Sequence, residues 1–175
     1  MNKIGIAGIY LFTALAIGCS NPSIVNVSEQ ETSILTSSAK IFIPRFEGRP
    51  DFVEESTDLF VAKLEANIPN TIIQGSVLRT ETTDIKSGSN LAPIDVALDT
   101  ASKNSADILI MGKVTSHRTA GSLNGFSTIR IYNVSTRKRV ANFHRPSGLL
   151  VGYSEHQCVM AAVQRTAKDV SEIFK

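Results

Sequence analysis

A cysteine and a histidine near the carboxyl end of the chain are the first candidates for a reactive site. Cys158 follows His156 by two residues, within a pattern that predicts a helix. A nucleophilic cysteine needs a base held beside its sulfur. Residues two apart on a helix point to different faces, so His156 does not serve Cys158 in this way. The sequence therefore predicts that Cys158 is a small buried side chain without a catalytic role.

Two further histidines stand at the ends of predicted strands. His117 and His144 could approach each other there, together with Asp107 or Glu155. Such a group would bind a metal ion or act as an acid–base pair. Exposed histidines at strand ends explain the same residues more simply, and we favour that interpretation.

Two carboxylates on a predicted helix are the next candidates for a catalytic pair. Asp95 and Asp99 are four residues apart on a predicted helix and share one face. No pattern puts them in a cleft, so a solvated helix face is the simpler interpretation. The chain also lacks the glycine-rich phosphate loops, the Gly-x-Ser-x-Gly elbow and the His-Glu-x-x-His pair of common enzymes. We therefore expect a protein without catalytic residues, bound metal or cofactor.

Basic residues form the best candidate for a binding surface. Arg137, Lys138 and Arg139 are consecutive, and Arg145 follows them. They would bind an acidic partner protein or anionic lipid head groups, and the alternative is a solubilising hairpin tip. On the first interpretation, neutralising Arg137 and Arg139 reduces capture of the partner and leaves the domain folded. The segment 117–126 contains two glycines and is predicted to be a mobile loop and a second contact surface.

The amino terminus has the pattern of an export signal. Residues 1–18 combine Lys3 with a continuous apolar run, and no charge follows before Glu29. The run is shorter than the roughly 20 residues of a membrane-spanning helix, so cleavage after export is expected. The four residues that end at Cys19, Ala-Ile-Gly-Cys, resemble a bacterial lipobox. This resemblance implies cleavage after Gly18 and a lipid on Cys19, and the alternative is a conventional signal peptide or an uncleaved anchor.

The segment that follows the cysteine suggests a location and a tether. In bacteria with two membranes, Ser20 in place of aspartate resembles the signal for delivery to the outer membrane, facing the periplasm. Residues 19–38 are rich in serine, threonine and asparagine and predict a flexible tether. An alternative, that part of this segment pairs with a sheet edge, rests on its apolar residues Ile24, Val25, Val27, Ile34 and Leu35.

The composition fits one globular domain. The chain has 175 residues, of which 42% are hydrophobic and 19% charged, and its formal net charge is +2. So small a charge does not create the positive field that sequence-independent nucleic-acid binding requires, so nucleic acid is excluded as a partner. Two cysteines are too few for a disulfide-stapled miniprotein.

Hydrophobic periodicity predicts a single α/β domain over residues 39–175. The helix after the first strand is expected to begin with Asp51 as its N-cap, and the last helix with Ser154. The order β-α-β-α-β-β-β-α predicts a mixed parallel and antiparallel sheet flanked by helices. The predicted elements are strand 39–44, helix 51–68, strand 71–78, helix 93–101, strand 106–115, hairpin strands 125–134 and 138–145, and helix 154–174.

Three segments of this domain carry a resemblance to a known group. They are Ile-Phe-Ile-Pro-Arg-Phe at 41–46, Ala-Asp-Ile-Leu-Ile-Met-Gly-Lys-Val at 106–114, and Ile-Arg-Ile-Tyr-Asn-Val-Ser-Thr at 129–136. Together with the element order, they resemble the periplasmic domain shared by the curli secretion lipoprotein CsgG, the penicillin-binding-protein activator LpoB and the amino-terminal part of TolB. Where that group commonly has Thr-Gly at the hairpin turn, this chain has Thr136 and Arg137.

The resemblance implies a noncatalytic role in envelope assembly. The favoured hypothesis is a membrane-anchored recruiter or activator of an envelope protein, whose anchor raises its concentration beside the partner. The first alternative is a self-assembling secretion or surface-appendage component, and a small metal-dependent or ligand-binding protein is the second. A pore is disfavoured, because the sequence shows one clear hairpin after the central strand.

Overall fold

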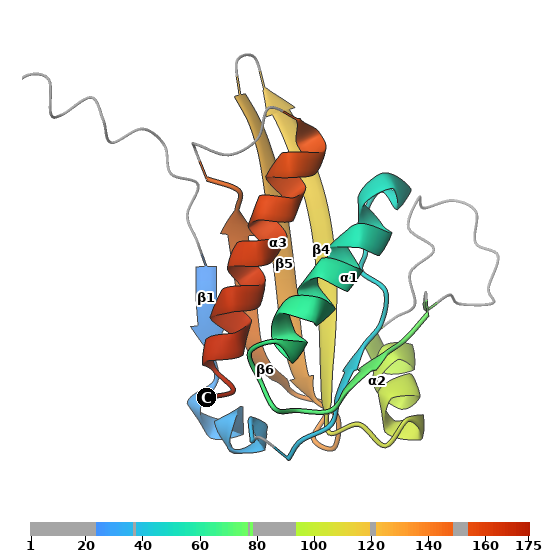
Figure 1. Ribbon diagram of the computed structural model, residues 1–175. Helices are drawn as coiled ribbons and strands as arrows, with labels where there is room; N and C mark the ends of the chain where they lie inside the picture. Colours follow the sequence, from blue (N-terminus) through green and yellow to red (C-terminus); the bar gives the residue numbers. More distant parts are fainter. Residues whose placement is uncertain (1–23, 37, 77, 79–93, 120–121, 149–153) are drawn as a thin grey trace, which may run out of the picture.

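The computed structural model describes residues 24–36, 38–76, 78, 94–119, 122–148 and 154–175 (Figure 1). The predicted signal peptide 1–18, the cleavage site between Gly18 and Cys19, and the lipid attachment to Cys19 lie outside the described residues. None of the helices in the described part is long and apolar enough to span a bilayer.

The described residues form a six-stranded mixed sheet in the order β1-β6-β5-β4-β2-β3. β2 runs parallel to both β3 and β4, and the other neighbours are antiparallel. The α/β fold class with a mixed sheet is therefore confirmed. The strands are β1 (Ile24–Val27), β2 (Ile41–Ile43), β3 (Ile72–Gln74), β4 (Ile108–Thr119), β5 (Ser122–Asn133) and β6 (Arg139–Pro146). The helices are the 3-10 helix η2 (Glu29–Ile34), α1 (Pro50–Glu65), α2 (Ile94–Lys103) and α3 (Glu155–Glu172).

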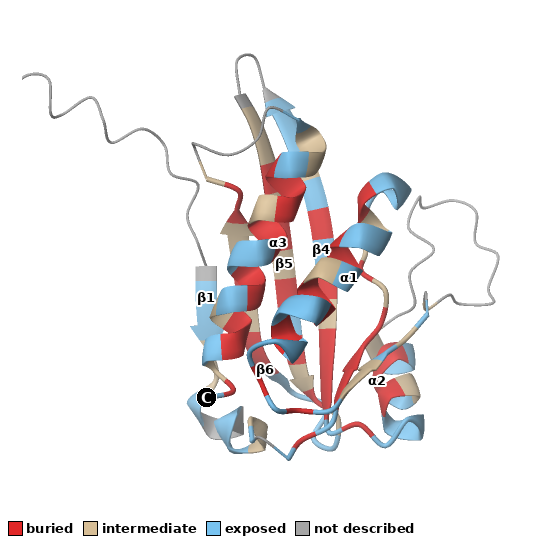
Figure 2. Ribbon diagram, in the orientation of Figure 1, coloured by how far each residue is buried: buried red, intermediate tan, exposed pale blue. Residues whose placement is uncertain are grey.

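Helices cover the two faces of the sheet unequally. α1 and α3 lie side by side across one face, where they turn their buried sides to the strands (Figures 1 and 2). α2 packs on the opposite face at the end where β2 and β4 begin. Side chains that alternate along β4 enter these two cores, with Ile108 and Ile110 on the α1–α3 side and Leu109 on the α2 side. All three are fully buried, which confirms that this strand is covered on both faces at its start.

The amino-terminal segment belongs to the folded domain. β1 pairs antiparallel with β6, and its Val25 and Val27 stand opposite Phe143 and Ala141. The amide of buried Asn70 donates to the carbonyls of Thr36 and Ala39, at 2.7 and 2.9 Å, and so secures the chain between η2 and β2. A flexible tether over the whole of 19–38 is therefore wrong for residues 24–36, and the alternative of pairing with a sheet edge is confirmed. The burial of the apolar side chains in this segment outweighs the conformational entropy that is lost when the segment becomes ordered.

Two other local predictions need correction. α1 begins at Pro50, with Arg49 as the N-cap residue, because proline at the first helical position has its φ preset and needs no amide hydrogen. Asp51 therefore lies in the first turn. Residues 117–119 and 122–126 are not a loop, since they pair as parts of β4 and β5 as far as Thr119 and Ser122. The glycines of this segment indicate a loop, but Gly125 lies within β5. The Ser154 cap is confirmed: its hydroxyl accepts from the amide of Gln157.

Candidate functional site

The part of the sheet beyond α2 presents a face that none of the described helices covers. We call this the open face, and it faces away from the viewer in Figure 1. Strand alternation produces it, because the neighbouring residues Val114, Ile129 and Phe143 point into the core beneath α1 and α3. Its side chains are those of Lys113, Thr115, His117, Asn124, Phe126, Thr128, Arg130, Asn142 and His144.

A fixed aromatic pair lies in the middle of the open face. The rings of Phe126 and His144 are stacked, with centroids 5.5 Å apart and planes inclined by 12°. The Thr128 hydroxyl and His144 Nδ1 are 2.9 Å apart and hydrogen-bonded, which restrains the imidazole. All three residues are half-buried. The pair is therefore a preformed, amphipathic platform on a rigid hairpin rather than a mobile loop.

Two cations flank this platform. Lys113 stands opposite Thr128 across the β4–β5 ladder, and Arg130 is the next outward residue of β5. Both side chains are exposed, and neither forms an ion pair within the part of the chain that the structure describes. Glu47, which bridges to the backbone of Lys113, lines a small depression together with Lys113 and Arg130. A guanidinium and an ammonium presented in this way suit carboxylates on a partner.

The predicted basic cluster is divided by the fold. The Arg137 guanidinium contacts Asp99 Oδ1 at 2.8 Å and Asp95 Oδ1 at 2.9 Å. The hydrogen bond to Asp99, and to a smaller extent the one to Asp95, raises the pKa of Arg137 above its ordinary value. The two carboxylates that share a face of α2 thus hold the β5–β6 turn against that helix. Arg145 lies on the other side of the sheet, where it pairs with Asp169 of α3.

The remaining two residues of that cluster are exposed at the start of β6. Arg139 stands opposite Tyr132, whose side chain packs with the α2 core, so Arg139 extends the open face at that end. Lys138 is its neighbour in the turn. The structure therefore brings Arg137, Lys138 and Arg139 together and separates Arg145 from them.

The residues considered for a metal or acid–base site are dispersed. His117 stands opposite Asn124 and His144 opposite Thr128, four residues apart along β5. The Asp107 carboxylate accepts from the amide of Lys40 at 2.8 Å, far along the strand from either histidine. Within the described residues, no group of three or more histidine, cysteine or acidic side chains is placed to hold a metal ion.

The cysteine of α3 lies where the sequence predicts. Cys158 is fully buried, and its Sγ is 3.5 Å from the carbonyl oxygen of Leu123. His156 points elsewhere, with Nε2 2.5 Å from the Glu55 carboxylate on α1. The predicted burial of the Cys158 side chain is therefore confirmed. Glu155, the first residue of α3, pairs with Arg49 at 2.9 Å and so helps to link the starts of α1 and α3.

The backbone of Arg137 offers a test of its structural role. Its φ is +57°, a conformation in which glycine is unstrained and other residues are not. Arg137→Ala should be less stable than Arg137→Gly, because both variants lose the ion pairs with Asp95 and Asp99 but only alanine retains the backbone strain. Urea denaturation of the two variants measures this order. Equal midpoints would show that the turn conformation does not contribute to stability.

Comparison with known proteins shows the fold. No protein-family model and no curated protein sequence matches this chain. A PelC dodecamer from Paraburkholderia phytofirmans is similar in structure, with a TM-score of 0.56 and 14% identity over 87% of this chain and 98% of that chain. A second crystal form of the PelC dodecamer gives a TM-score of 0.53 and 16% identity, over 87% and 97%. The LpoB C-terminal domain from Salmonella enterica gives a TM-score of 0.45 and 10% identity, over 66% and 93%. At such identities the PelC likeness concerns architecture alone.

Proposed function

We propose that this protein is a lipid-anchored, noncatalytic contact module of the bacterial cell envelope. It is held at the outer membrane through a lipid on Cys19 and faces the periplasm. Through the open face it binds the acidic surface of an envelope protein, and it recruits or activates that protein in envelope assembly.

The observation that carries this proposal is the construction of the open face. Its stacked Phe126 and His144 are half-buried and rigid, and the exposed cations Lys113 and Arg130 stand beside them. Aromatic and arginine side chains dominate the energetics of protein interfaces. The strands β4, β5 and β6 that carry the face are interior strands of the six-stranded sheet, so little conformational entropy is lost when a partner binds.

The charge of the face favours an acidic partner. The outward residues of β4, β5 and β6 include Lys113, Arg130 and Arg139 and no acidic residue, and Glu47 lies at the margin beside Lys113 and Arg130. Complementary charge accelerates association and selects among partners more than it adds affinity. An anchor in the same membrane layer as the partner then makes a modest affinity sufficient.

Charge reversal on the open face tests the proposal. Lys113→Glu combined with Arg130→Glu should reduce capture of the envelope partner by about tenfold, because each carboxylate then repels an acidic surface. The measurement is chemical crosslinking in cells of the full, lipid-anchored protein, followed by affinity capture and quantitative mass spectrometry.

Two exposed lysines outside the open face provide the matched control for this assay. Lys40→Glu combined with Lys103→Glu makes the same change in net charge and should leave capture unchanged. Equal capture by the two double variants, both folded by circular dichroism, would remove the open face as the contact surface.

A second candidate function is self-assembly, as in the alternative of a secretion or surface-appendage component. The fold likeness to PelC, which crystallised as a dodecamer, favours it. A second copy also offers acidic chemistry, because an open groove along α1 is lined by Asp51, Glu54, Glu55 and Asp58. Contact between α1 of one copy and the open face of the next would be heterologous, the type of interface from which rings are built when the rotation between copies closes. Native mass spectrometry of the detergent-extracted lipoprotein distinguishes the two, since a ring gives one large discrete mass and an adaptor gives a monomer.

A further inference from the structure

The first strand fixes which edge of the domain lies next to the lipid anchor. β1 begins at Ile24, which pairs with His144 near the end of β6. Five residue steps separate Ile24 from Cys19. Fully extended, that length of chain spans at most roughly 18 Å. A lipid on Cys19 therefore holds the start of β1 within about that distance of the bilayer.

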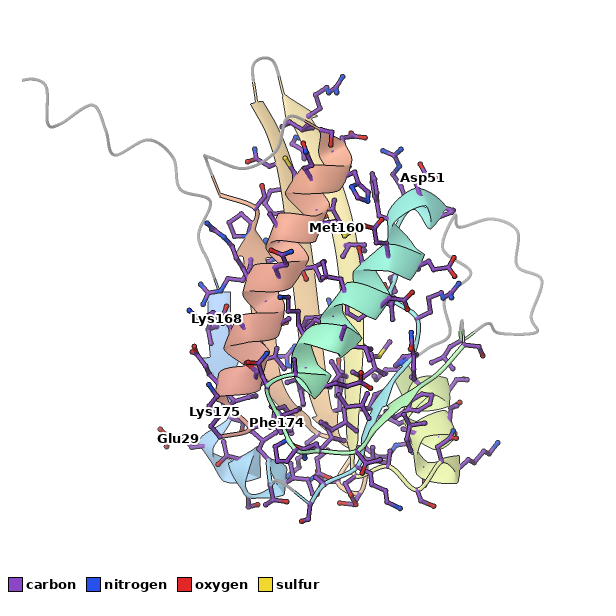
Figure 3. The ribbon with its side chains drawn as sticks, in the orientation of Figure 1. Glu29, Asp51, Met160, Lys168, Phe174 and Lys175 are labelled. Carbon is purple, nitrogen blue, oxygen red and sulfur yellow. The ribbon has the colours of Figure 1, made fainter. Side chains whose placement is uncertain are left out.

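Basic side chains gather beside this edge. A Cβ built on Gly148, two residues after β6, would lie 2.8 Å from the guanidinium nitrogens of Arg165, so this guanidinium packs against the end of β6. Lys168 is one helical turn further along α3, and in Figure 3 it extends from the side of α3 that is nearer to β1. Both side chains are exposed. Arg145 is also at this edge, where Asp169 neutralises it.

We propose that the β1–β6 edge of the sheet faces the bilayer and that Arg165 and Lys168 contact anionic lipid head groups there. This inference rests on the proposed lipid at Cys19. The short connection to Cys19 keeps the β1–β6 edge close to the bilayer. The two exposed cations then orient this edge toward the bilayer, because lysine and arginine are attracted to an anionic membrane surface within a few ångströms of it.

The orientation determines what the rest of the molecule can reach. β3 is the opposite edge of the sheet, five strand spacings from β1, which is roughly 24 Å. With the β1–β6 edge on the membrane, the sheet is perpendicular to the membrane plane, and the open face is directed parallel to that plane. Its partners are then proteins in the same membrane layer rather than distant ones in the cell wall.

Energy transfer to the bilayer tests this orientation with the full lipoprotein in vesicles. A fluorescent donor is attached at Gln164→Cys, beside the basic pair, or at Lys103→Cys, at the end of α2, and the acceptor is on the lipid head groups. Both positions are exposed and distant from Cys19 in the sequence, whereas Cys158 is fully buried. Vesicles of phosphatidylcholine are compared with vesicles that also contain phosphatidylglycerol.

We expect transfer from Gln164→Cys to exceed transfer from Lys103→Cys several-fold, with a larger difference on the anionic vesicles. Arg165→Glu combined with Lys168→Glu should abolish that increase, and the control pair Lys40→Glu with Lys63→Glu should not. Equal transfer from the two positions, with the protein still floating with the vesicles, would overturn the orientation alone. Loss of flotation together with an unmodified Cys19 by mass spectrometry would overturn the proposed anchor and the orientation with it.

Discussion

Replacing Gly125 with alanine is expected to lower the free energy of unfolding by about 3 kcal/mol, a large effect for the addition of one methyl group. A Cβ at this position would lie 2.3 Å from the backbone carbonyl carbon of Cys158 and 2.4 Å from its oxygen. These atoms belong to the first turn of α3 and have no flexible side chain that could move aside. The helix must therefore shift away from β5, where Ser147 also bonds to both backbone groups of Gly125.

Urea denaturation of Gly125→Ala measures this effect, and Ser127→Ala is the matched control. Ser127 lies two residues further on the same strand and the same face, is fully buried, and its hydroxyl has no hydrogen-bond partner in the described structure. Removal of that hydroxyl should be neutral or slightly stabilising. If both variants unfold at the same urea concentration as the parent, the backbone of α3 at Cys158 does not lie as close to Gly125 of β5 as the structure shows.

Replacing Phe60 with alanine is the second large effect, at about 3–5 kcal/mol. Phe60 is fully buried on α1, and its ring is 5.2 Å from that of Phe46. Its truncation leaves a cavity between α1 and the sheet, and close-packed neighbours only partly fill such a cavity. Thermal and urea unfolding should both show the loss, while the residues of the open face on the other side of the sheet remain in place.

Truncating a phenylalanine of the open face should lower partner capture more than it lowers stability. Phe126→Ala removes a half-buried ring that stacks on His144, so we expect it to cost about 1 kcal/mol of stability. It also removes the centre of the proposed contact surface, so capture of the partner should fall strongly. If Phe60→Ala and Phe126→Ala lower capture only in proportion to their loss of stability, the open face has no special role in binding.

Sequence patterns predicted most elements of the fold for physical reasons. Apolar periodicity defined α1 and α3, since each buries one face, and the continuous apolar start of β4 indicated burial on both sides. The pairing of Ile129 and Ile131 with Phe143 and Ala141 followed from the two-residue period of strands. Such local rules depend on neighbouring residues and need no knowledge of distant contacts.

The errors arose where a distant contact decides the local structure. β1 forms because β6 provides a partner more than a hundred residues away, and the polar composition around it indicated a tether. Strands β4 and β5 include residues 117–119 and 122–126, where Gly125 allows α3 to pack closely, although the two glycines of this segment had indicated a loop. Arg137 was considered for partner binding, but Asp95 and Asp99 of α2 hold it within the domain. No local pattern shows these pairings.

The open face was only partly visible in the sequence. Alternation put Thr128, Arg130 and Tyr132 on one side of a strand, but it could not tell which part of that side α2 covers. The neighbouring positions of Lys113 and His144 depend on the register of three strands, which the sequence alone did not fix.

The most direct test of the central claim is photo-crosslinking in living cells from a reporter residue placed at Arg130 of the native, lipid-anchored protein. The same reporter at Lys103 is the matched control, and Cys19→Ala removes the proposed anchor. The account predicts adducts between Arg130 and an acidic envelope protein that are rare from Lys103 and lost without the anchor, whereas adducts with a second copy of this chain would favour self-assembly instead. Adducts that are equally frequent from both positions, or unchanged in the Cys19→Ala form, would contradict it.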